Sequence, residues 1–158
     1  MKLVITALLL SFNLYAGSRE RLPEEVRGRV LKIYQANEKL HAAFFKYDKQ
    51  KVEHYAGEVF KAASLVQNPK VRQKLKYALV KLKEISGTNK RKINDENYYQ
   101  VSIALVNILK AFDIGDIYDV YHCPMVKKSW VQNSKKQPKV HNPYAPWMPH
   151  CGERKRAF

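Results

Sequence analysis

Hydrophobic residues recur at intervals of three and four along four segments of the chain. This spacing keeps the side chains on one face of a helix with 3.6 residues per turn. Each segment therefore predicts an amphipathic helix that buries one face against the others. The four segments run from Val26 to Tyr47, from Val52 to Val66, from Val71 to Ile85 and from Tyr98 to Phe112.

The breaks between these segments carry residues that cap helices. Asp48 is placed to cap the second helix, and Asn68-Pro69 supplies a cap and a first-turn proline for the third. Asn94-Asp95-Glu96 is expected to open the fourth helix. Connections this short favour antiparallel neighbours, so the pattern predicts an all-α fold, an up-down four-helix bundle over residues 17–115.

The chain changes character after Gly115. The segment from Ile117 to Tyr121 alternates apolar and polar residues, which predicts a short strand. Five prolines follow from Pro124 onward and exclude a long helix. We therefore expect residues 116–158 to form an extended, proline-rich tail that packs on the bundle as part of the same domain.

The start of the chain has the order of a secretory signal peptide. Lys2 gives a positive start, Leu3 to Phe12 is apolar, and Ala16 is a small residue at the expected cleavage site. The apolar run is shorter than the roughly 20 residues that span a bilayer, and no later stretch is apolar enough to span one. The sequence therefore predicts an exported protein from which residues 1–16 are removed.

The net charge of +15, or +14 once Lys2 is removed with the signal peptide, bears on the choice of partner. Such a charge attracts nucleic acid, anionic lipid headgroups or acidic proteins. Export argues against nucleic acid and leaves an acidic periplasmic protein or an anionic envelope surface. The third helical segment carries six Lys and Arg residues before its first acid, Glu84, although a solvated surface is the simpler explanation of that stretch.

Both cysteines lie in the tail, each with a methionine nearby, in Cys123-Pro124-Met125 and Met148-Pro149-His150-Cys151. Thiolate and thioether sulfur favour Cu(I) over hard cations and accept imidazole as a companion ligand, which His122 and His150 would supply. Four converging sulfurs would suit Cu(I) or Ag(I). Two cysteines in an exported protein also commonly form a disulfide, so a Cys123–Cys151 bond is the main alternative. A thiol pair can also alternate between the two states.

Four motifs of the tail occur in a fixed order: His122-Cys123-Pro124-Met125, Trp130, Asn142-Pro143-Tyr144 and Met148-x-x-Cys151-Gly152. This pattern, in the last quarter of the chain, resembles the DUF3347 family. These are exported bacterial helical proteins related to domains on the periplasmic adaptor subunits of copper and silver efflux systems. The chain departs from the family pattern at Ala145-Pro146-Trp147, where members carry an aromatic residue and a glycine.

The resemblance implies a periplasmic protein that binds Cu(I) or Ag(I) and sequesters the ion or hands it to a metal efflux adaptor. The matching ligand positions are Cys123, Met125, Met148 and Cys151. Catalysis finds no support, because the chain has no Cys-x-x-Cys redox pair, no Gly-x-Ser-x-Gly elbow and no glycine-rich phosphate loop. We therefore expect a binding protein without enzymatic activity and without an organic cofactor.

Several other residues are expected to be structural. Asn142-Pro143-Tyr144 suits a turn in which the Asn side chain bonds the backbone and the Tyr ring packs on the bundle. Trp130 and Trp147 are expected to pin the tail to the core or to shield the sulfurs from water. His41 and His54 lie inside predicted helices, away from ligand-spaced partners, and are expected to be ordinary surface or flanking residues.

Overall fold

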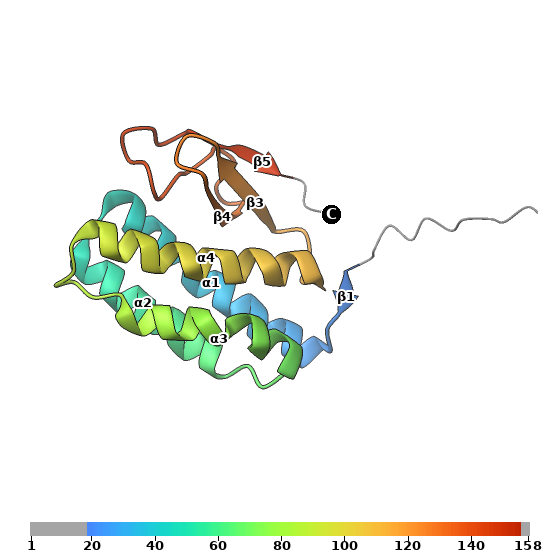
Figure 1. The fold of residues 1–158 in the computed structure, drawn as a ribbon. Coiled ribbons are helices and arrows are strands. Elements are labelled where there is room, and N and C mark those ends of the chain that lie inside the picture. The colour runs from blue at the N-terminus through green and yellow to red at the C-terminus, as the bar shows by residue number, and fades with distance from the viewer. Residues whose placement is uncertain (1–18, 156–158) are drawn as a thin grey trace, which may run out of the picture.

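The computed structural model describes residues 19–155, so the predicted signal peptide lies outside the described residues. Within that range the chain forms four helices followed and preceded by short strands (Figure 1). The helices are α1 (Glu24–Lys46), α2 (Lys49–Ser64), α3 (Pro69–Glu84) and α4 (Arg91–Ala111). The strands are β1 (Glu20–Arg21), β2 (Phe112–Asp113), β3 (Tyr118–Cys123), β4 (Lys128–Asn133) and β5 (Glu153–Lys155).

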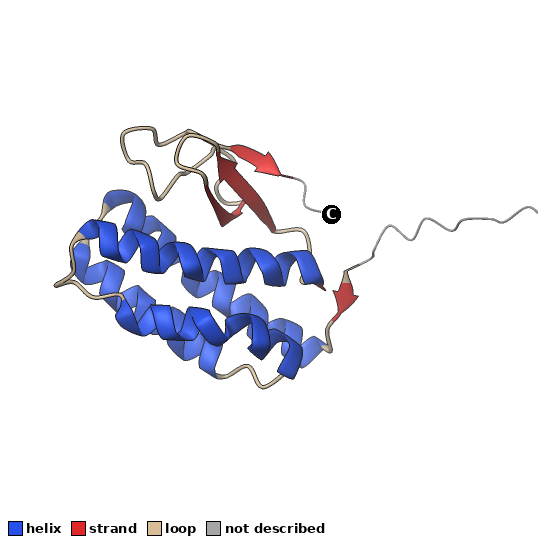
Figure 2. Cartoon of the chain, viewed as in Figure 1, coloured by secondary structure: helices blue, strands red, loops and turns tan. Residues whose placement is uncertain are grey.

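The expectation of an all-α fold is wrong. Helices account for 55% of the structure, and strands in two sheets account for a further 14% (Figure 2). Strands β3, β4 and β5 form an antiparallel sheet in the order β4-β3-β5. Strands β1 and β2 form a short parallel pair that ties the start of α1 to the end of α4. The tail is therefore a folded β layer and not an extended segment.

The four helices lie where the hydrophobic stripes predict them and run in alternating directions (Figure 1). The stripes face inward, as the almost complete burial of Ile33 in α1, Val59 in α2, Leu75 in α3 and Leu105 in α4 illustrates. None of these helices carries an apolar stretch long enough to cross a membrane, within residues 19–155.

The predicted caps of α2 and α3 are confirmed, but the predicted start of α4 is wrong. The Asp48 carboxylate accepts a hydrogen bond from the backbone N–H of Lys51, and Asn68 caps α3 in the same way. Helix α4 begins at Arg91, one turn earlier than expected. The side chain of Asn94 instead accepts from the backbone N–H of Ser86 at 3.2 Å and donates to the Ser86 carbonyl at 2.8 Å. It therefore closes the α3–α4 loop and does not cap its own helix.

The β3–β4–β5 sheet covers the side of the bundle formed by α1 and α4, away from α2 and α3 (Figure 2). The Tyr118 hydroxyl on β3 donates to Glu38 of α1 at 2.6 Å. Trp130 on β4 is fully buried, and its ring lies 6.3 Å from that of Tyr144, centroid to centroid. Buried residues of the helices and of the tail form one continuous core, so the bundle positions the sheet on which the cysteines lie.

Candidate functional site

Pairing of β5 with β3 brings the two cysteines together. The strands are antiparallel, with His122 opposite Glu153, so the chain just before β5 lies beside the end of β3. Cys123 and Cys151 form a disulfide at this junction, with 5.7 Å between their Cα atoms and a sequence separation of 28 residues. The structure therefore describes the oxidised state of the two cysteines. The sequence analysis had left this disulfide open as the alternative to a metal site.

The disulfide is packed against the core on one side and reaches solvent on the other. Cys123 is fully buried, whereas Cys151 is partly exposed. Gly152 follows with a φ of +148°, and a Cβ built on it would lie 2.8 Å from Cη2 of Trp130. The Trp130 ring thus packs against the backbone beside the disulfide, and its full burial agrees with the expectation that it pins the tail to the core. Trp147 is 70% exposed, so the expectation that it pins the tail or shields the sulfurs is wrong.

The two methionines flank the disulfide. Met125 lies in the turn between β3 and β4, two residues after Cys123, and is 70% exposed. Met148 is partly exposed, and its carbonyl accepts a hydrogen bond from the backbone N–H of Cys151 at 2.9 Å. One turn therefore fixes the backbone spacing between Met148 and Cys151, while Met125 presents its thioether to solvent.

The two predicted histidine ligands differ in their access to the disulfide. Successive residues of a strand point to opposite faces, so His122 lies on the other face of β3 from Cys123. Its Nδ1 lies 2.9 Å from Oγ of Ser129. His150 is exposed, and its Nδ1 donates to the carbonyl of Val140 at 2.7 Å, which leaves Nε2 as the acceptor nitrogen. The imidazole of His150 is therefore the more accessible of the two.

Asn142 fixes the backbone that carries Cys151. It is fully buried, and its Nδ2 donates to the Cys151 carbonyl at 2.9 Å while its Oδ1 accepts from the backbone N–H of Tyr144 at 2.9 Å. The Tyr144 hydroxyl lies 2.6 Å from Oγ of Ser102 on α4. The prediction of a structural turn at Asn142-Pro143-Tyr144 is therefore confirmed, and this turn anchors the second cysteine to the bundle.

The residues around the disulfide fit a soft metal ion only when the disulfide is reduced. A disulfide sulfur offers no thiolate, and thiolate is the form of cysteine that binds metals. Within residues 19–155 no three His, Cys, Asp or Glu side chains are grouped as a metal site. Reduction would free two thiolates on a backbone that already holds their Cα atoms 5.7 Å apart, with Met125 and Met148 two and three residues away in the sequence.

The sequence placed His41 wrongly. It was expected to be an ordinary surface or flanking residue, but it is 6% exposed, and its Nε2 lies 3.1 Å from Nδ1 of His141 in the tail. The available signal was its spacing, because His41 follows the core residue Asn37 by four and so lies on the same face of α1. Its partner is 100 residues away in the sequence, and no local pattern predicts that contact.

Comparisons of the chain with family models, with curated proteins and with solved structures give no match. The resemblance to the DUF3347 family therefore stays a prediction that rests on the motifs of the tail.

Proposed function

We propose that this protein is an exported Cu(I)- or Ag(I)-binding protein whose two cysteines bind the ion when reduced and close as a disulfide when oxidised. The observation that carries the proposal is the Cys123–Cys151 junction. Two cysteines 28 residues apart meet with 5.7 Å between their Cα atoms, and each has a methionine within three residues. The biological role that follows is sequestration of the ion in the periplasm, or handover to a metal efflux adaptor.

The chemistry of the donors supports a soft monovalent ion. Thiolates and thioethers are the ligands that Cu(I) prefers among protein side chains, whereas zinc sites draw on thiolates, imidazoles and carboxylates. Cys123 and Cys151 would supply the charged ligands, and Met125 and Met148 the neutral ones. The exposed thioether of Met125 is placed to meet an ion arriving from solvent, and the buried Cys123 lies two residues before it in the chain.

The motifs of the tail give independent support. Of the ligand positions of the resemblance, Cys123 and Cys151 meet where β3 pairs with β5, and Met125 and Met148 lie two and three residues from them in the sequence. Asn142 ties the backbone of Cys151 to the turn that packs on α4. A fixed backbone holds ligands in place when the disulfide opens, which a binding site for a small ion requires.

Competition with a chromophoric Cu(I) chelator tests the proposal. We expect the protein reduced with a phosphine to withdraw one equivalent of Cu(I) from the chelator, and the oxidised protein to withdraw none. Met125→Leu and Met148→Leu should weaken binding, and the double variant Cys123→Ser/Cys151→Ser should abolish it. A reduced protein that fails to compete at one equivalent, or a double variant that competes as well as the parent, would overturn the proposal.

The disulfide itself favours a second candidate, an interaction module that binds an acidic protein or an anionic envelope surface. Helix α3 carries six Lys and Arg residues, of which Lys70 and Lys81 pair with carboxylates among residues 19–155. Its outer face also exposes Tyr77 and Val80, which are 56% and 49% exposed. A basic face with apolar side chains suits an anionic partner.

Two measurements separate the candidates. Thiol counting on protein taken directly from the periplasm should find two free thiols if the metal-binding form is the working form, and none if the disulfide is permanent. Binding of an acidic partner or anionic vesicles through α3 should weaken steeply with salt and should survive Met125→Leu and Met148→Leu. Salt-independent binding would exclude the α3 surface.

A further inference from the structure

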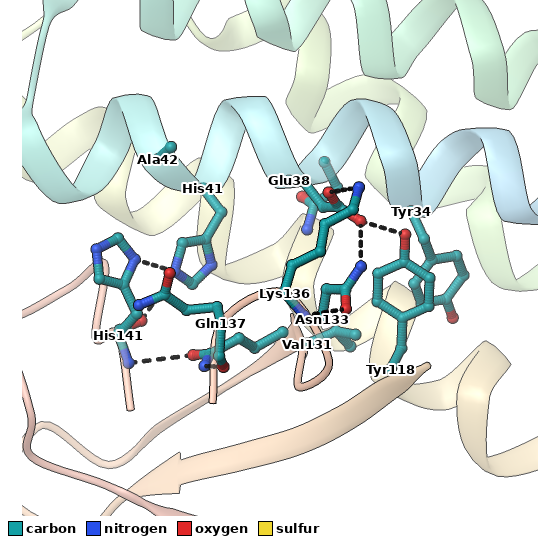
Figure 3. A pocket seen from close by; sticks show the side chains of 12 residues that line it. Tyr34, Glu38, His41, Ala42, Tyr118, Val131, Asn133, Lys136, Gln137 and His141 are labelled. Carbon is teal, nitrogen blue, oxygen red and sulfur yellow. Dashed lines mark hydrogen bonds and ion pairs between the residues drawn. The ribbon is translucent and has the colours of Figure 1, made fainter. Parts of the chain in front are cut away.

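Helix α1 has one side covered by the tail and another side that meets α2 at the surface. On the covered side, Tyr34, Glu38 and His41 line a cavity of about 180 Å³ against the tail (Figure 3). On the other side α1 and α2 pack along each other in opposite directions (Figure 1). The seam between these two helices is open to solvent, since Lys32 on α1 and Lys61 on α2 are both exposed.

The seam is hollowed along much of its length. A first hollow of about 620 Å³ is lined on α1 by residues from Arg29 to Lys39, and a second of about 350 Å³ by residues from Lys39 to Lys46. The two hollows meet at Lys39, so they form one groove between residues 29–46 of α1 and 51–65 of α2. At a rise of 1.5 Å per residue this α1–α2 groove is roughly 25 Å long.

The α1–α2 groove carries a large excess of positive charge. Arg29 pairs with Glu25 outside the groove, and Lys51 pairs with Asp48 within it. Four further lysines of the lining are exposed and form no ion pair within residues 19–155, and only one further carboxylate, Glu58, lies among them. These four are Lys32, Lys39, Lys46 and Lys61. Exposed and unpaired cations of this kind favour an anionic partner.

The lysines of α1 are spaced as charged residues are in coiled coils. Lys32, Lys39 and Lys46 follow one another at intervals of seven, which places them about two turns apart along one edge of the groove. Ala36 and Ala43 have the same interval and line the groove with small side chains. In coiled coils, charged residues at this interval flank an apolar seam and select the partner helix through ion pairs.

The shape of the groove favours a helix over other anionic partners. A third helix packs into the furrow between two neighbouring helices, and small side chains at the contact let the axes approach closely. The side chain of Leu65, which is 56% exposed, adds an apolar contact at one end. A bilayer surface is flat and makes no use of a seven-residue interval. A second copy of this chain would bring its own net charge of +15 against the same lysines.

We propose that the α1–α2 groove binds one amphipathic helix of a partner protein. The apolar face of that helix packs on Ala36 and Ala62, and its Asp or Glu residues, seven apart, pair with the lysines of α1. The proposal does not rest on the metal-binding function, because no cysteine or methionine lines the groove. It also concerns a different surface from that of α3.

A designed peptide tests the proposal on the oxidised protein. The probe has three heptads, about 21 residues, with blocked ends, Leu at a and d, and Glu at e and g. Its matched control has Lys in place of every Glu, which keeps the apolar face and reverses the charge. We expect the Glu peptide to bind with a dissociation constant of about 0.1 mM or tighter at about 0.15 M salt, followed by NMR of the amide resonances.

The shifted amides should be those of residues 29–46 and 51–65, and the Lys peptide should not bind at millimolar concentration. Failure of the Glu peptide to bind at that concentration, or equal binding of the two peptides, would overturn the proposal. Shifts confined to α3 would place the peptide on the other basic surface and would overturn it as well. Anionic phospholipid vesicles that perturb the groove amides when the Glu peptide does not would assign the groove to a membrane instead.

Variants then assign the contacts. Lys32→Glu/Lys39→Glu should weaken binding of the Glu peptide by about tenfold or more, because two attractions become repulsions. The matched control Lys92→Glu/Lys110→Glu changes the net charge equally at two exposed positions of α4 and should stay within about twofold of the parent.

A neutral change in the groove separates docking from adsorption by charge. Ala36→Gln should weaken binding of the Glu peptide, because a longer side chain would occupy the place of the peptide. Parent-like affinity of this variant, or of Lys32→Glu/Lys39→Glu, would show that the peptide binds outside the groove and would contradict the proposal. Circular dichroism of each variant checks that the helices are intact.

Discussion

Removal of the Cys123–Cys151 disulfide should cost the protein a defined amount of stability. The bond closes a loop with a sequence separation of 28 residues, which includes the whole of β4 and the turn around Asn142. The three residues of β5 are exposed, so they add no buried packing contact. Once the disulfide is broken, β5 is held mainly by its pairing with β3. The perturbation is the double variant Cys123→Ala/Cys151→Ala, compared with chemically reduced parent protein.

The chain-entropy treatment of crosslinks gives the expected magnitude. A closed loop of 28 residues lowers the entropy of the unfolded chain by about 12 cal/mol/K, which corresponds to about 3.6 kcal/mol at 25 °C. For a protein of this size, 1 kcal/mol shifts the melting temperature by roughly 2–4 °C. Loss of the disulfide should therefore lower the melting temperature by roughly 7–14 °C.

Thermal and urea unfolding, followed by circular dichroism, measure this loss. Reduced parent protein and the double alanine variant should agree, because both lack the crosslink, and the oxidised parent should exceed both. Alanine is preferred to serine at position 123 because Cys123 is fully buried and a hydroxyl there would add a desolvation cost. A variant that melts within about 2 °C of the oxidised parent would refute the view that the crosslink stabilises the native fold.

Four further predictions concern single residues of the tail, of α1 and of α2. Gly152→Ala should destabilise the protein by about 1–3 kcal/mol, because φ is +148° and the new Cβ would meet Trp130 at 2.8 Å. Gly57→Ala, in an open position of α2, should stabilise it by about 0.5–1 kcal/mol, and urea unfolding of both variants checks the sign. Asn142→Ala should cost about 2–4 kcal/mol by the same measurement, since the buried backbone N–H of Tyr144 and the part-buried carbonyl of Cys151 lose their hydrogen bonds; an unchanged midpoint would contradict the anchoring role. Burial lowers the pKa of His41 from the ordinary 6.5 to about 3 in the folded protein. Below about pH 6.5 the unfolded chain therefore takes up a proton that the folded protein does not. The free energy of unfolding should fall by about 2 kcal/mol between pH 7 and pH 5. Urea unfolding followed by tryptophan fluorescence at each pH checks this, and a His41→Gln variant with the same pH slope would refute it.

The helices were predictable because their signals are local. Each stripe of apolar residues repeats within one segment, and Asp48 and Asn68 mark helix starts through contacts only three residues away. The start of α4 was predicted wrongly from the same kind of local signal, because an Asn before an apolar stripe is typical of a helix cap. The side chain of Asn94 instead serves a loop eight residues earlier, and the sequence alone does not distinguish the two uses.

The sheet was not predictable in full, because its third strand carries no pattern. Residues Glu153–Lys155 are all charged and exposed, so β5 has no alternation to identify it. It is a strand only because β3 offers its edge and Cys151 is bonded to Cys123 just before it. The cavity at His41 was equally hidden, since its two histidines are 100 residues apart. Residue types gave the disulfide as one alternative, but only the β3–β5 register places the two cysteines together.

On the proposed function, the disulfide and the metal ion are alternative ways of closing the same loop. A Cu(I) ion held by Cys123 and Cys151 joins the same two points of the chain as the disulfide does, so it should restore part of the stability that reduction removes. A ligand that binds only the folded state at a hundred times its dissociation constant stabilises that state by about 2.7 kcal/mol, which is close to the cost of losing the crosslink. The reduced, metal-free protein would then be less stable than both the oxidised and the Cu(I)-bound protein. Binding of the ion would be coupled to restoring the link between the residues before β5 and the end of β3. This coupling predicts that one equivalent of Cu(I) raises the melting temperature of the reduced parent towards that of the oxidised protein, and leaves the double alanine variant unchanged. An equal rise in both proteins would place the ion elsewhere and separate the stability of the tail from metal binding.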